Sequence, residues 1–148
     1  GGSFGGYMAN WIGTQTDRFR ALVSHAGLFH LPSFHGTTDY PAYLADELGV
    51  GPYDEDGGDA FRRYSPERFV ARWRTPVLFI HGERDYRVPI SEALIAFEAV
   101  RLAGADAELL VFPDENHWIL KPRNARAWYA AWLEFVDRHL GIRRAEAS

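Results

Sequence analysis

The segment 75–82, Thr-Pro-Val-Leu-Phe-Ile-His-Gly, constrains the fold of this chain more than any other. Its four consecutive large apolar residues, Val77 to Ile80, stand between Pro76 and Gly82. A short apolar run between such breakers is typical of a strand that is buried on both faces. Strands of this kind belong to parallel sheets with helices packed on both sides. The segment therefore predicts an α/β fold.

Strand and helix patterns alternate along the rest of the chain. Further strands are predicted at 19–27 and 107–113, and helices at 7–12, 41–48, either 59–64 or 66–73, and 122–140. Apart from its one helix, the stretch 28–58 is broken by Gly and Pro, and 142–148 forms a polar tail. This alternation predicts a mostly parallel sheet with right-handed crossovers and helices on both faces, in one domain or part of one.

One more helix is predicted after the buried strand, with Ser91 as its N-cap and Gly104 as its stop signal. The apolar residues expected on its buried face are Ala93, Leu94, Phe97 and Val100.

Composition excludes several classes of protein. The 148 residues are 47% hydrophobic, which is too apolar for a disordered chain. Sixteen scattered Lys+Arg residues against 20 Asp+Glu leave a net charge of −4, so nucleic-acid binding is not expected. Cysteine is absent, which rules out disulfides, thiolate zinc sites and a cysteine nucleophile. No apolar run approaches the roughly 18 residues of a membrane span, so no membrane partner is expected.

The opening residues Gly1-Gly2-Ser3-Phe4-Gly5 match the pattern Gly-x-Ser-x-Gly. In a nucleophile elbow this pattern holds a serine on a strained turn between a strand and a helix, and the glycines relieve steric crowding. A Gly-rich linker could produce the same letters. The apolar helix predicted immediately afterwards favours the elbow, because a flexible linker would not continue in this way. Ser3 is therefore the candidate nucleophile.

A serine nucleophile needs a general base, and histidine has the pKa suited to that role. His117 is the candidate because it follows the last strand, in a loop that can reach over the edge of the sheet. His25 lies within a strand and is expected to be a core residue or a support for a neighbouring catalytic side chain. His81 ends a strand and could orient the next loop.

The remaining histidines have simpler interpretations. The five-residue spacing from His25 to His30 and His35 suits neither helical nor strand chelation, so no metal site is predicted. His139 lies near the end of a helix, where a cation is favourable.

The base in turn needs a carboxylate that orients it. Asp85 lies in the loop after the buried strand, at the sheet edge where α/β proteins place functional groups. Asp114 and Glu83 are rivals, although Asp114 is better suited to shaping its own turn. The resulting order Ser3, Asp85, His117 is the chain order of α/β-hydrolases.

With these motifs in place, the chain resembles the catalytic domain of the prolyl oligopeptidase family of serine peptidases, closest to its acylaminoacyl-peptidase and dipeptidyl-aminopeptidase-like branches. The resemblance extends from residue 1 to about Leu140 and is carried by Gly1-Gly2-Ser3-Phe4-Gly5-Gly6-Tyr7-Met8, Asp17-Arg18-Phe19, His81-Gly82-Glu83-Arg84-Asp85-Tyr86-Arg87-Val88-Pro89 and Glu115-Asn116-His117. It implies the C-terminal portion of an α/β-hydrolase fold that starts at the nucleophile elbow. The upstream strands and an N-terminal β-propeller are then expected outside residues 1–148.

The resemblance also implies a mechanism without a cofactor. Ser3, His117 and Asp85 would act as a catalytic triad on short peptides, and the backbone N–H of Phe4 would donate to the oxyanion. A second oxyanion donor is expected from upstream, so residues 1–148 alone are expected to be inactive or barely stable. An apolar substrate pocket is expected at Phe29, Leu31 and Phe34, whose alternative role is plain core packing.

Other interpretations stay open at this point. A carboxylesterase can use the same fold and triad, and a non-catalytic hydrolase-like domain would serve binding or assembly. Homo-oligomerisation of the full-length protein, substrate preference, and a cytoplasmic or periplasmic location are undetermined. All basic residues except Lys121 are Arg, which is compatible with a GC-rich bacterial source.

Overall fold

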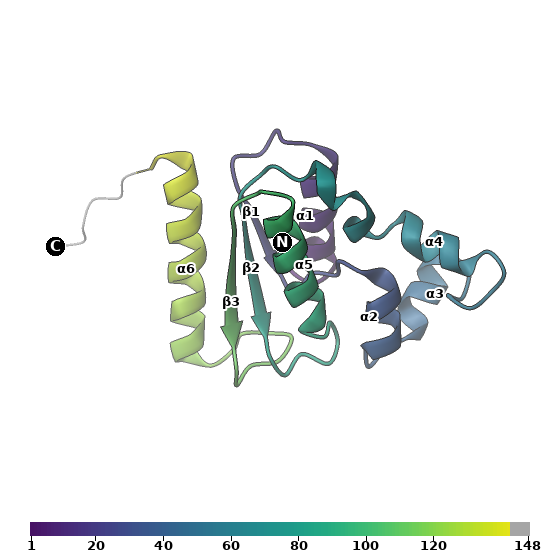
Figure 1. Ribbon diagram of the computed structural model, residues 1–148. Coiled ribbons are helices and arrows are strands. Elements are labelled where there is room, and N and C mark those ends of the chain that lie inside the picture. The colour runs from purple at the N-terminus through teal and green to yellow at the C-terminus, as the bar shows by residue number, and fades with distance from the viewer. Residues whose placement is uncertain (143–148) are drawn as a thin grey trace.

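The computed structural model describes residues 1–142 and contains a three-stranded sheet flanked by helices (Figure 1). The predicted polar tail, apart from Ile142, lies outside the described residues. The elements in chain order are α1 (Phe4–Gln15), β1 (Leu22–His25), α2 (Leu31–Thr37), α3 (Ala42–Leu48), α4 (Gly57–Arg63), the 3-10 helix η1 (Pro66–Arg72), β2 (Val77–Gly82), α5 (Ser91–Leu102), β3 (Ala107–Phe112) and α6 (Pro122–Leu140).

The strands are parallel and lie in the order β1-β2-β3, as the alternation of elements predicts. Leu22 pairs with Val77 at one end of the sheet, and Val77 pairs in turn with Ala107. Every residue of the central strand β2 is buried, in agreement with its apolar sequence. On the other side of β1, Gly2 forms a parallel bridge with His25. The elbow turn therefore begins beside the carboxyl end of β1.

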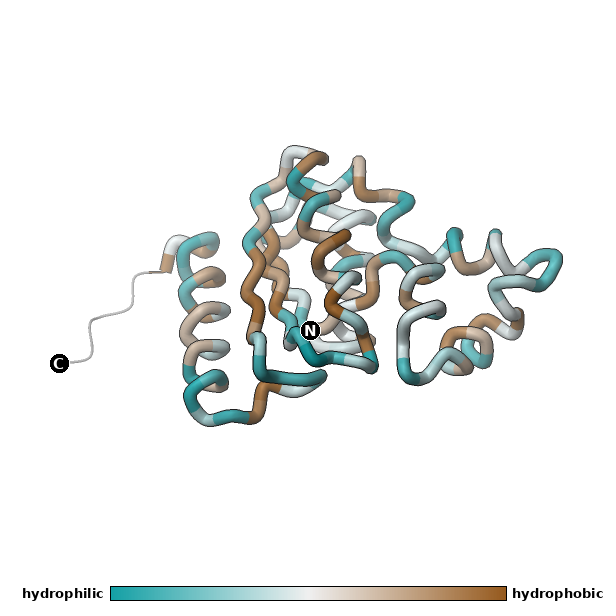
Figure 2. Tube along the Cα trace, turned by 60° about the horizontal axis from the view of Figure 1, so that its bottom comes forward, coloured by the Kyte–Doolittle hydropathy of each residue, from teal (hydrophilic) through white to brown (hydrophobic). Residues whose placement is uncertain are grey.

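Helices cover both faces of the sheet (Figure 1). Successive side chains of a strand point to opposite faces. Val77 and Phe79 of β2 pack in a core with residues of α5, whereas Leu78 and Ile80 pack against Phe135 of α6. Figure 2 shows the apolar residues concentrated in the strands and in α5, and polar and apolar residues interspersed along α6. No helix of residues 1–142 is both long and apolar enough to cross a membrane.

Helices α2, α3 and α4 project from one side of the sheet (Figure 1) and have a small core of their own. This core contains Leu28, Leu31, Phe34, Leu44, Phe61 and Val88. Because Val88 belongs to the loop after β2, the core joins the helical segment to that loop. The helical segment therefore lies beside the carboxyl ends of the strands.

The helical segment departs from prediction in two ways. The segment that forms helix α2 was predicted to be irregular. It is helical because Pro32 is accommodated in the first turn and a Cβ at Gly36 would meet nothing within 4 Å. Its burial of Leu31 and Phe34 supplies the stabilisation that the local sequence does not indicate. Both α4 and η1 form, where the pattern predicts one or the other.

Two of the predicted helix boundaries were also wrong. Helix α1 continues through Gly13 to Gln15, because Gly13 is a contact point and not a stop signal: a Cβ there would lie 2.5 Å from the Trp73 ring. Ser91 is not the N-cap of α5, since Ile90 already has helical backbone angles.

The buried face of α5 was partly mispredicted as well. Leu94 is 49% exposed, whereas the charged residue Glu92 is fully buried. The Glu92 carboxylate accepts hydrogen bonds from the backbone N–H groups of Phe29 and His30, which fixes the rotation of the helix.

Candidate active site

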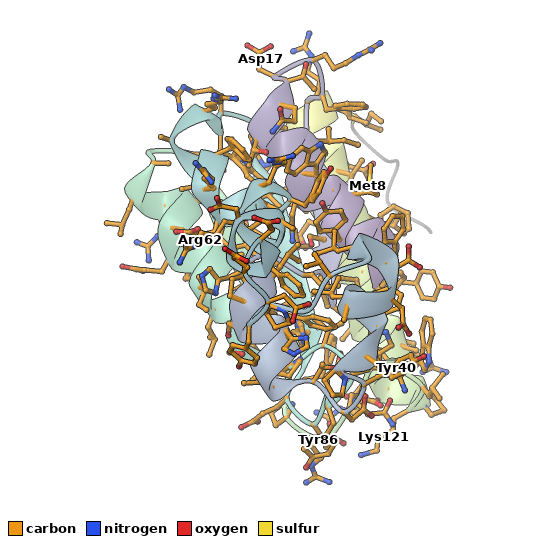
Figure 3. All side chains as sticks on the ribbon, turned by 90° about the vertical axis from the view of Figure 1, so that its right-hand side faces the viewer. Met8, Asp17, Tyr40, Arg62, Tyr86 and Lys121 are labelled. Carbon is orange, nitrogen blue, oxygen red and sulfur yellow. The ribbon has the colours of Figure 1, made fainter. Side chains whose placement is uncertain are left out.

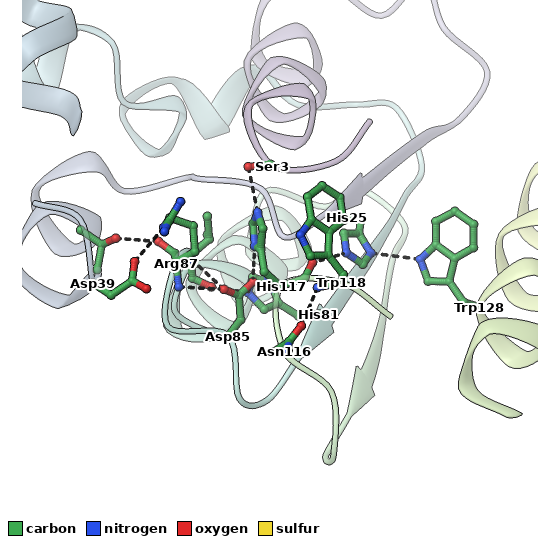
Figure 4. A network of polar contacts seen from close by, with 12 residues as sticks. Ser3, His25, Asp39, His81, Asp85, Arg87, Asn116, His117, Trp118 and Trp128 are labelled. Atoms are coloured by element: carbon green, nitrogen blue, oxygen red, sulfur yellow. Dashed lines mark hydrogen bonds and ion pairs between the residues drawn. The ribbon is translucent and has the colours of Figure 1, made fainter. Parts of the chain in front are cut away.

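Ser3, Asp85 and His117 meet at the carboxyl ends of the parallel strands (Figure 4). Ser3 occupies the turn before α1, Asp85 lies in the loop after β2, and His117 lies in the loop after β3. Three segments far apart in sequence thus converge, because parallel strands end at a common edge of the sheet.

The three side chains form a continuous chain of hydrogen bonds. The Ser3 hydroxyl donates to Nε2 of His117 over 3.0 Å, and Nδ1–H of His117 donates to Oδ2 of Asp85 over 2.7 Å. Both distances are within the normal range. These hydrogen bonds place an imidazole nitrogen where it can accept the serine proton and a carboxylate where it can stabilise the resulting imidazolium. This arrangement is suited to nucleophilic catalysis.

The backbone at Ser3 is strained. Its φ of 56° and ψ of −119° are unusual for a residue with a side chain, and such conformations cost about 1–3 kcal/mol. Three backbone hydrogen bonds hold the turn. Ser3 N–H donates to the His25 carbonyl and Tyr7 N–H donates to the Ser3 carbonyl, each over 2.9 Å, and Gly5 N–H donates to the Gly2 carbonyl over 2.8 Å. The turn presents the hydroxyl to Nε2 of His117.

The loop after β2 holds Asp85 in a buried position. Oδ1 of Asp85 accepts hydrogen bonds from the backbone N–H groups of Arg87, over 3.0 Å, and Val88, over 2.8 Å. Nε2–H of His81 donates to the Val88 carbonyl over 2.7 Å, and burial lowers the pKa of this imidazole. A neutral His81 thus orients the loop, as predicted from its place at the strand end. Oδ2 of Asp85 stays directed at His117.

The same loop is fastened to the helical segment. Arg87 Nε donates to Asp39 over 2.7 Å, Asp39 N–H donates to the Tyr86 carbonyl, and the Thr38 hydroxyl donates to the Arg87 carbonyl. Figure 3 shows Tyr40 and Tyr86 at one end of the molecule, opposite Asp17.

The loop that carries His117 packs closely on the end of β2. A Cβ at Gly82 would lie 2.1 Å from the Asn116 carbonyl oxygen, so only glycine leaves room for this loop. Glu115 is buried and accepts hydrogen bonds from the backbone N–H of Lys121 and from Asn124. These contacts fix the residues on both sides of His117.

The rival carboxylate Asp114 has a different place. It accepts hydrogen bonds from Lys121 Nζ over 2.6 Å and from Asn124 over 2.9 Å, and it shapes the turn after β3.

A cavity of about 190 Å³ lies beside the elbow. Its lining is mainly apolar and aromatic and consists of Phe4, Tyr7, Leu28, Leu31, Tyr43, Leu44, Glu47, Leu48 and Tyr64. Of the three residues expected to line a substrate pocket, only Leu31 lines this cavity. Phe29 is buried in the core that β2 forms with α5, and Phe34 is buried among α2, α3 and α4.

Sequence reasoning missed most of this lining. Tyr7 could have been inferred from its position three residues after Phe4, on the same face of the helix. Tyr43 and Tyr64 come from α3 and from the residue after α4, and only the tertiary fold brings them to the cavity. Within residues 1–142 no group of three or more potential metal ligands is found.

Sequence comparison with known proteins identifies a family and several relatives. The model of the prolyl oligopeptidase family matches residues 1–143. Dipeptidyl-peptidase 5 of Porphyromonas endodontalis is 39% identical over 143 residues, which are 95% of this chain and 21% of that protein. Dipeptidyl-peptidase 5 of Schizosaccharomyces pombe is 39% identical over 138 residues, which are 92% of this chain and 20% of that protein. The chain thus spans about a fifth of the length of these relatives.

Solved structures show the same fold. An acylaminoacyl peptidase of Pyrococcus horikoshii superposes with a TM-score of 0.87 at 27% identity, covering 100% of this chain and 24% of that chain. A puromycin-hydrolyzing peptidase of Mycobacterium tuberculosis superposes with a TM-score of 0.89 at 31% identity, covering 97% of this chain and 22% of that chain. The fold is that of the α/β-hydrolase peptidases. From the family match and these relatives we conclude that the chain belongs to the prolyl oligopeptidase family of serine peptidases.

Proposed function

We propose that the full-length protein containing this chain is a serine peptidase that cleaves short peptides through an acyl-enzyme. The observation that carries the proposal is the unbroken hydrogen-bond chain from Ser3 through His117 to Asp85. The names of the relatives, dipeptidyl-peptidase 5 and acylaminoacyl peptidase, favour peptide bonds over esters as substrates.

In the proposed mechanism the Ser3 oxygen attacks the scissile carbonyl carbon while its proton passes to Nε2 of His117. The imidazolium then protonates the leaving amine, which departs and leaves an acyl group on Ser3. Water enters, gives a proton to His117, and attacks the ester, and Ser3 leaves with the returned proton. Asp85 accepts the Nδ1–H bond throughout and stabilises the imidazolium.

The oxyanion of each tetrahedral intermediate would be stabilised by the backbone N–H of Phe4. Phe4 is the first residue of α1, and the first N–H groups of a helix have no acceptors within the helix. The helix N-terminus also favours negative charge. A second donor would come from a part of the protein outside residues 1–148, and the loss of one such donor costs about 10²–10³ in turnover.

The cavity beside Phe4 is the proposed pocket for an apolar substrate side chain. Phe4, the residue after the proposed nucleophile, is part of its lining, in which aliphatic and aromatic side chains dominate. The Tyr7 hydroxyl donates to the Tyr64 carbonyl over 2.8 Å, which joins α1 to the end of α4 across the cavity. We therefore expect peptides with a medium-sized apolar residue before the cleaved bond to be preferred substrates.

The remaining four fifths of the relatives' length suggest what else the full-length protein would contain. We propose that upstream segments complete the hydrolase sheet and form a β-propeller that limits access to short peptides. Residues 1–148 alone should then show little turnover of an aminoacyl substrate. Turnover by residues 1–148 comparable to that of the full-length protein would contradict the proposal that upstream segments are needed for activity.

Steady-state kinetics of the full-length protein test the proposal. We expect hydrolysis of a dipeptidyl-nitroanilide with an apolar second residue, and loss of this activity in Ser3→Ala and His117→Ala variants that fold normally. Activity on a nitrophenyl ester alone would favour a carboxylesterase. A folded protein inactive on both substrates would favour a non-catalytic domain.

A further inference from the structure

His25 lies at the carboxyl end of β1 and is 8% exposed. Its side chain bridges two distant parts of the chain (Figure 4). The indole Nε1–H of Trp128, in α6, donates to Nδ1 of His25 over 3.0 Å. On the other side of the ring, Nε2 of His25 lies 3.2 Å from the backbone carbonyl oxygen of His117. The imidazole thus stands between helix α6 and the loop that carries the proposed base.

These two contacts define the tautomer of His25. An indole N–H can only donate and a carbonyl oxygen can only accept. Nδ1 must therefore be unprotonated, and Nε2 must carry the proton that it donates to His117. Only the neutral Nε2–H form satisfies both partners at once.

The backbone of His25 contacts Ser3, the other end of the hydrogen-bond network that includes His117. Its carbonyl accepts the N–H of Ser3 over 2.9 Å, which is one of the backbone hydrogen bonds that hold the strained elbow. One residue therefore contacts the backbone of both the nucleophile and the base. Asp85 is held separately, by the amides of its own loop.

We propose that His25 is a positioning residue, whose neutral imidazole anchors the His117 backbone to α6 and thereby sets the distance between His117 Nε2 and the Ser3 hydroxyl. This inference rests on the proposed peptidase function. It assigns His25 no contact with substrate.

Burial favours a neutral ring. It is the largest influence on His25 and lowers its pKa, and His81 on β2 and His117 in the loop after β3 act in the same direction. The hydrogen bond to the His117 carbonyl and the Asp85 carboxylate in the loop after β2 raise the pKa in part. Protonation would place an N–H of His25 against the N–H of Trp128 and would add a positive charge beside His117. Acidification should therefore weaken the anchor and disfavour the imidazolium that catalysis needs.

Four variants of the full-length protein test this role. His25→Leu removes both contacts, whereas His25→Gln keeps one acceptor and one donor. Trp128→Phe removes only the indole donor. Trp132→Phe is the matched control, because Trp132 lies one helical turn later and its indole Nε1 is buried without a hydrogen-bond partner among residues 1–142.

The measurements are kcat, KM, the rate of Ser3 labelling by a fluorophosphonate, and the thermal midpoint. We expect His25→Leu to lower kcat and the labelling rate about tenfold or more, since small displacements of reacting groups are costly, with KM little changed. His25→Gln should recover most of the loss, Trp128→Phe should lose about fivefold, and Trp132→Phe should match the parent. Parent-like kcat and labelling in folded His25→Leu and Trp128→Phe would overturn the proposal.

A spectroscopic readout separates this inference from the proposed function. In protein labelled with [¹⁵N]histidine, the signal that disappears in His25→Gln belongs to His25, and it should report the neutral Nε2–H tautomer at pH 7. Trp128→Phe should change its Nδ1 shift. A protonated His25 or an Nδ1–H tautomer would overturn the inference even if the protein proved inactive. Inactivity with the expected tautomer would instead contradict the proposed peptidase.

Discussion

The buried carboxyl group of Glu92 predicts an unusual dependence of stability on pH. Glu92 lies in the first turn of α5 and is fully buried. Its Oε2 accepts the backbone N–H of Phe29 over 2.8 Å and of His30 over 2.7 Å, while Oε1 has no hydrogen-bond partner among residues 1–142. Burial raises the pKa of Glu92 from 4.5 to about 7, although the two amide bonds and the nearby Ser33 side chain lower it in part.

The sign and size of the effect follow from proton linkage. Between pH 4.5 and about 7 the folded protein holds a proton at Glu92 that the unfolded chain has lost. The raised pKa therefore contributes stability that is fully present below pH 4.5 and is lost as pH rises through 7. The loss amounts to about 3 kcal/mol, because one pKa unit corresponds to about 1.4 kcal/mol.

Glu92→Gln removes this titration and keeps the size of the side chain. Urea unfolding of the full-length protein, followed by tryptophan fluorescence from pH 4.5 to 8, measures the free energy of unfolding of both proteins. The variant should gain about 3 kcal/mol relative to the parent as pH rises across this range. Glu98→Gln, at an exposed position of the same helix, is the control. A difference between Glu92→Gln and the parent that does not vary with pH would show that the Glu92 carboxyl does not have the raised pKa.

Three further predictions concern the active site. Asp85→Asn should lower kcat about 10⁴-fold with little change in KM, since a misoriented base affects chemistry more than binding; a loss under tenfold would contradict its role. Gly82→Ala places a Cβ 2.1 Å from the Asn116 carbonyl oxygen and should slow fluorophosphonate labelling, whereas Gly36→Ala, where a Cβ meets nothing within 4 Å, should not. Leu31→Ala should lower kcat/KM about tenfold for a leucyl substrate and less for an alanyl one, measured with matched nitroanilides; equal losses would place the pocket elsewhere.

The parts of the fold that sequence predicts well are those whose signal is local. Val77 to Ile80 form the fully buried central strand because continuous apolar residues leave little choice. The long helix α6 ends at Gly141, which adopts the left-handed conformation expected of a helix stop. Ser3, Asp85 and His117, which the structure brings into contact, could also be proposed from sequence, because the elbow motif and the strand-end loops are local features.

Tertiary contacts decide the features that sequence reasoning missed. Helix α2 contains Pro32 and Gly36 and forms because Leu31 and Phe34 are buried against other helices. The rotation of α5 follows from the bond between Glu92 and a turn more than 60 residues away in sequence. Tyr43 and Tyr64 reach the cavity only through the packing of α3 and α4. None of these contacts leaves a periodic signal in the sequence.

In the proposed mechanism His117, held by Asp85, activates Ser3 as a nucleophile. The most direct measurement is fluorophosphonate labelling of the full-length protein, followed by proteolysis and mass spectrometry of the elbow peptide. We predict a single adduct on Ser3, formed rapidly in the parent and at a strongly reduced rate in folded His117→Ala. An adduct on another residue, or labelling of Ser3 at the same rate in His117→Ala, would contradict the activation of Ser3 by His117.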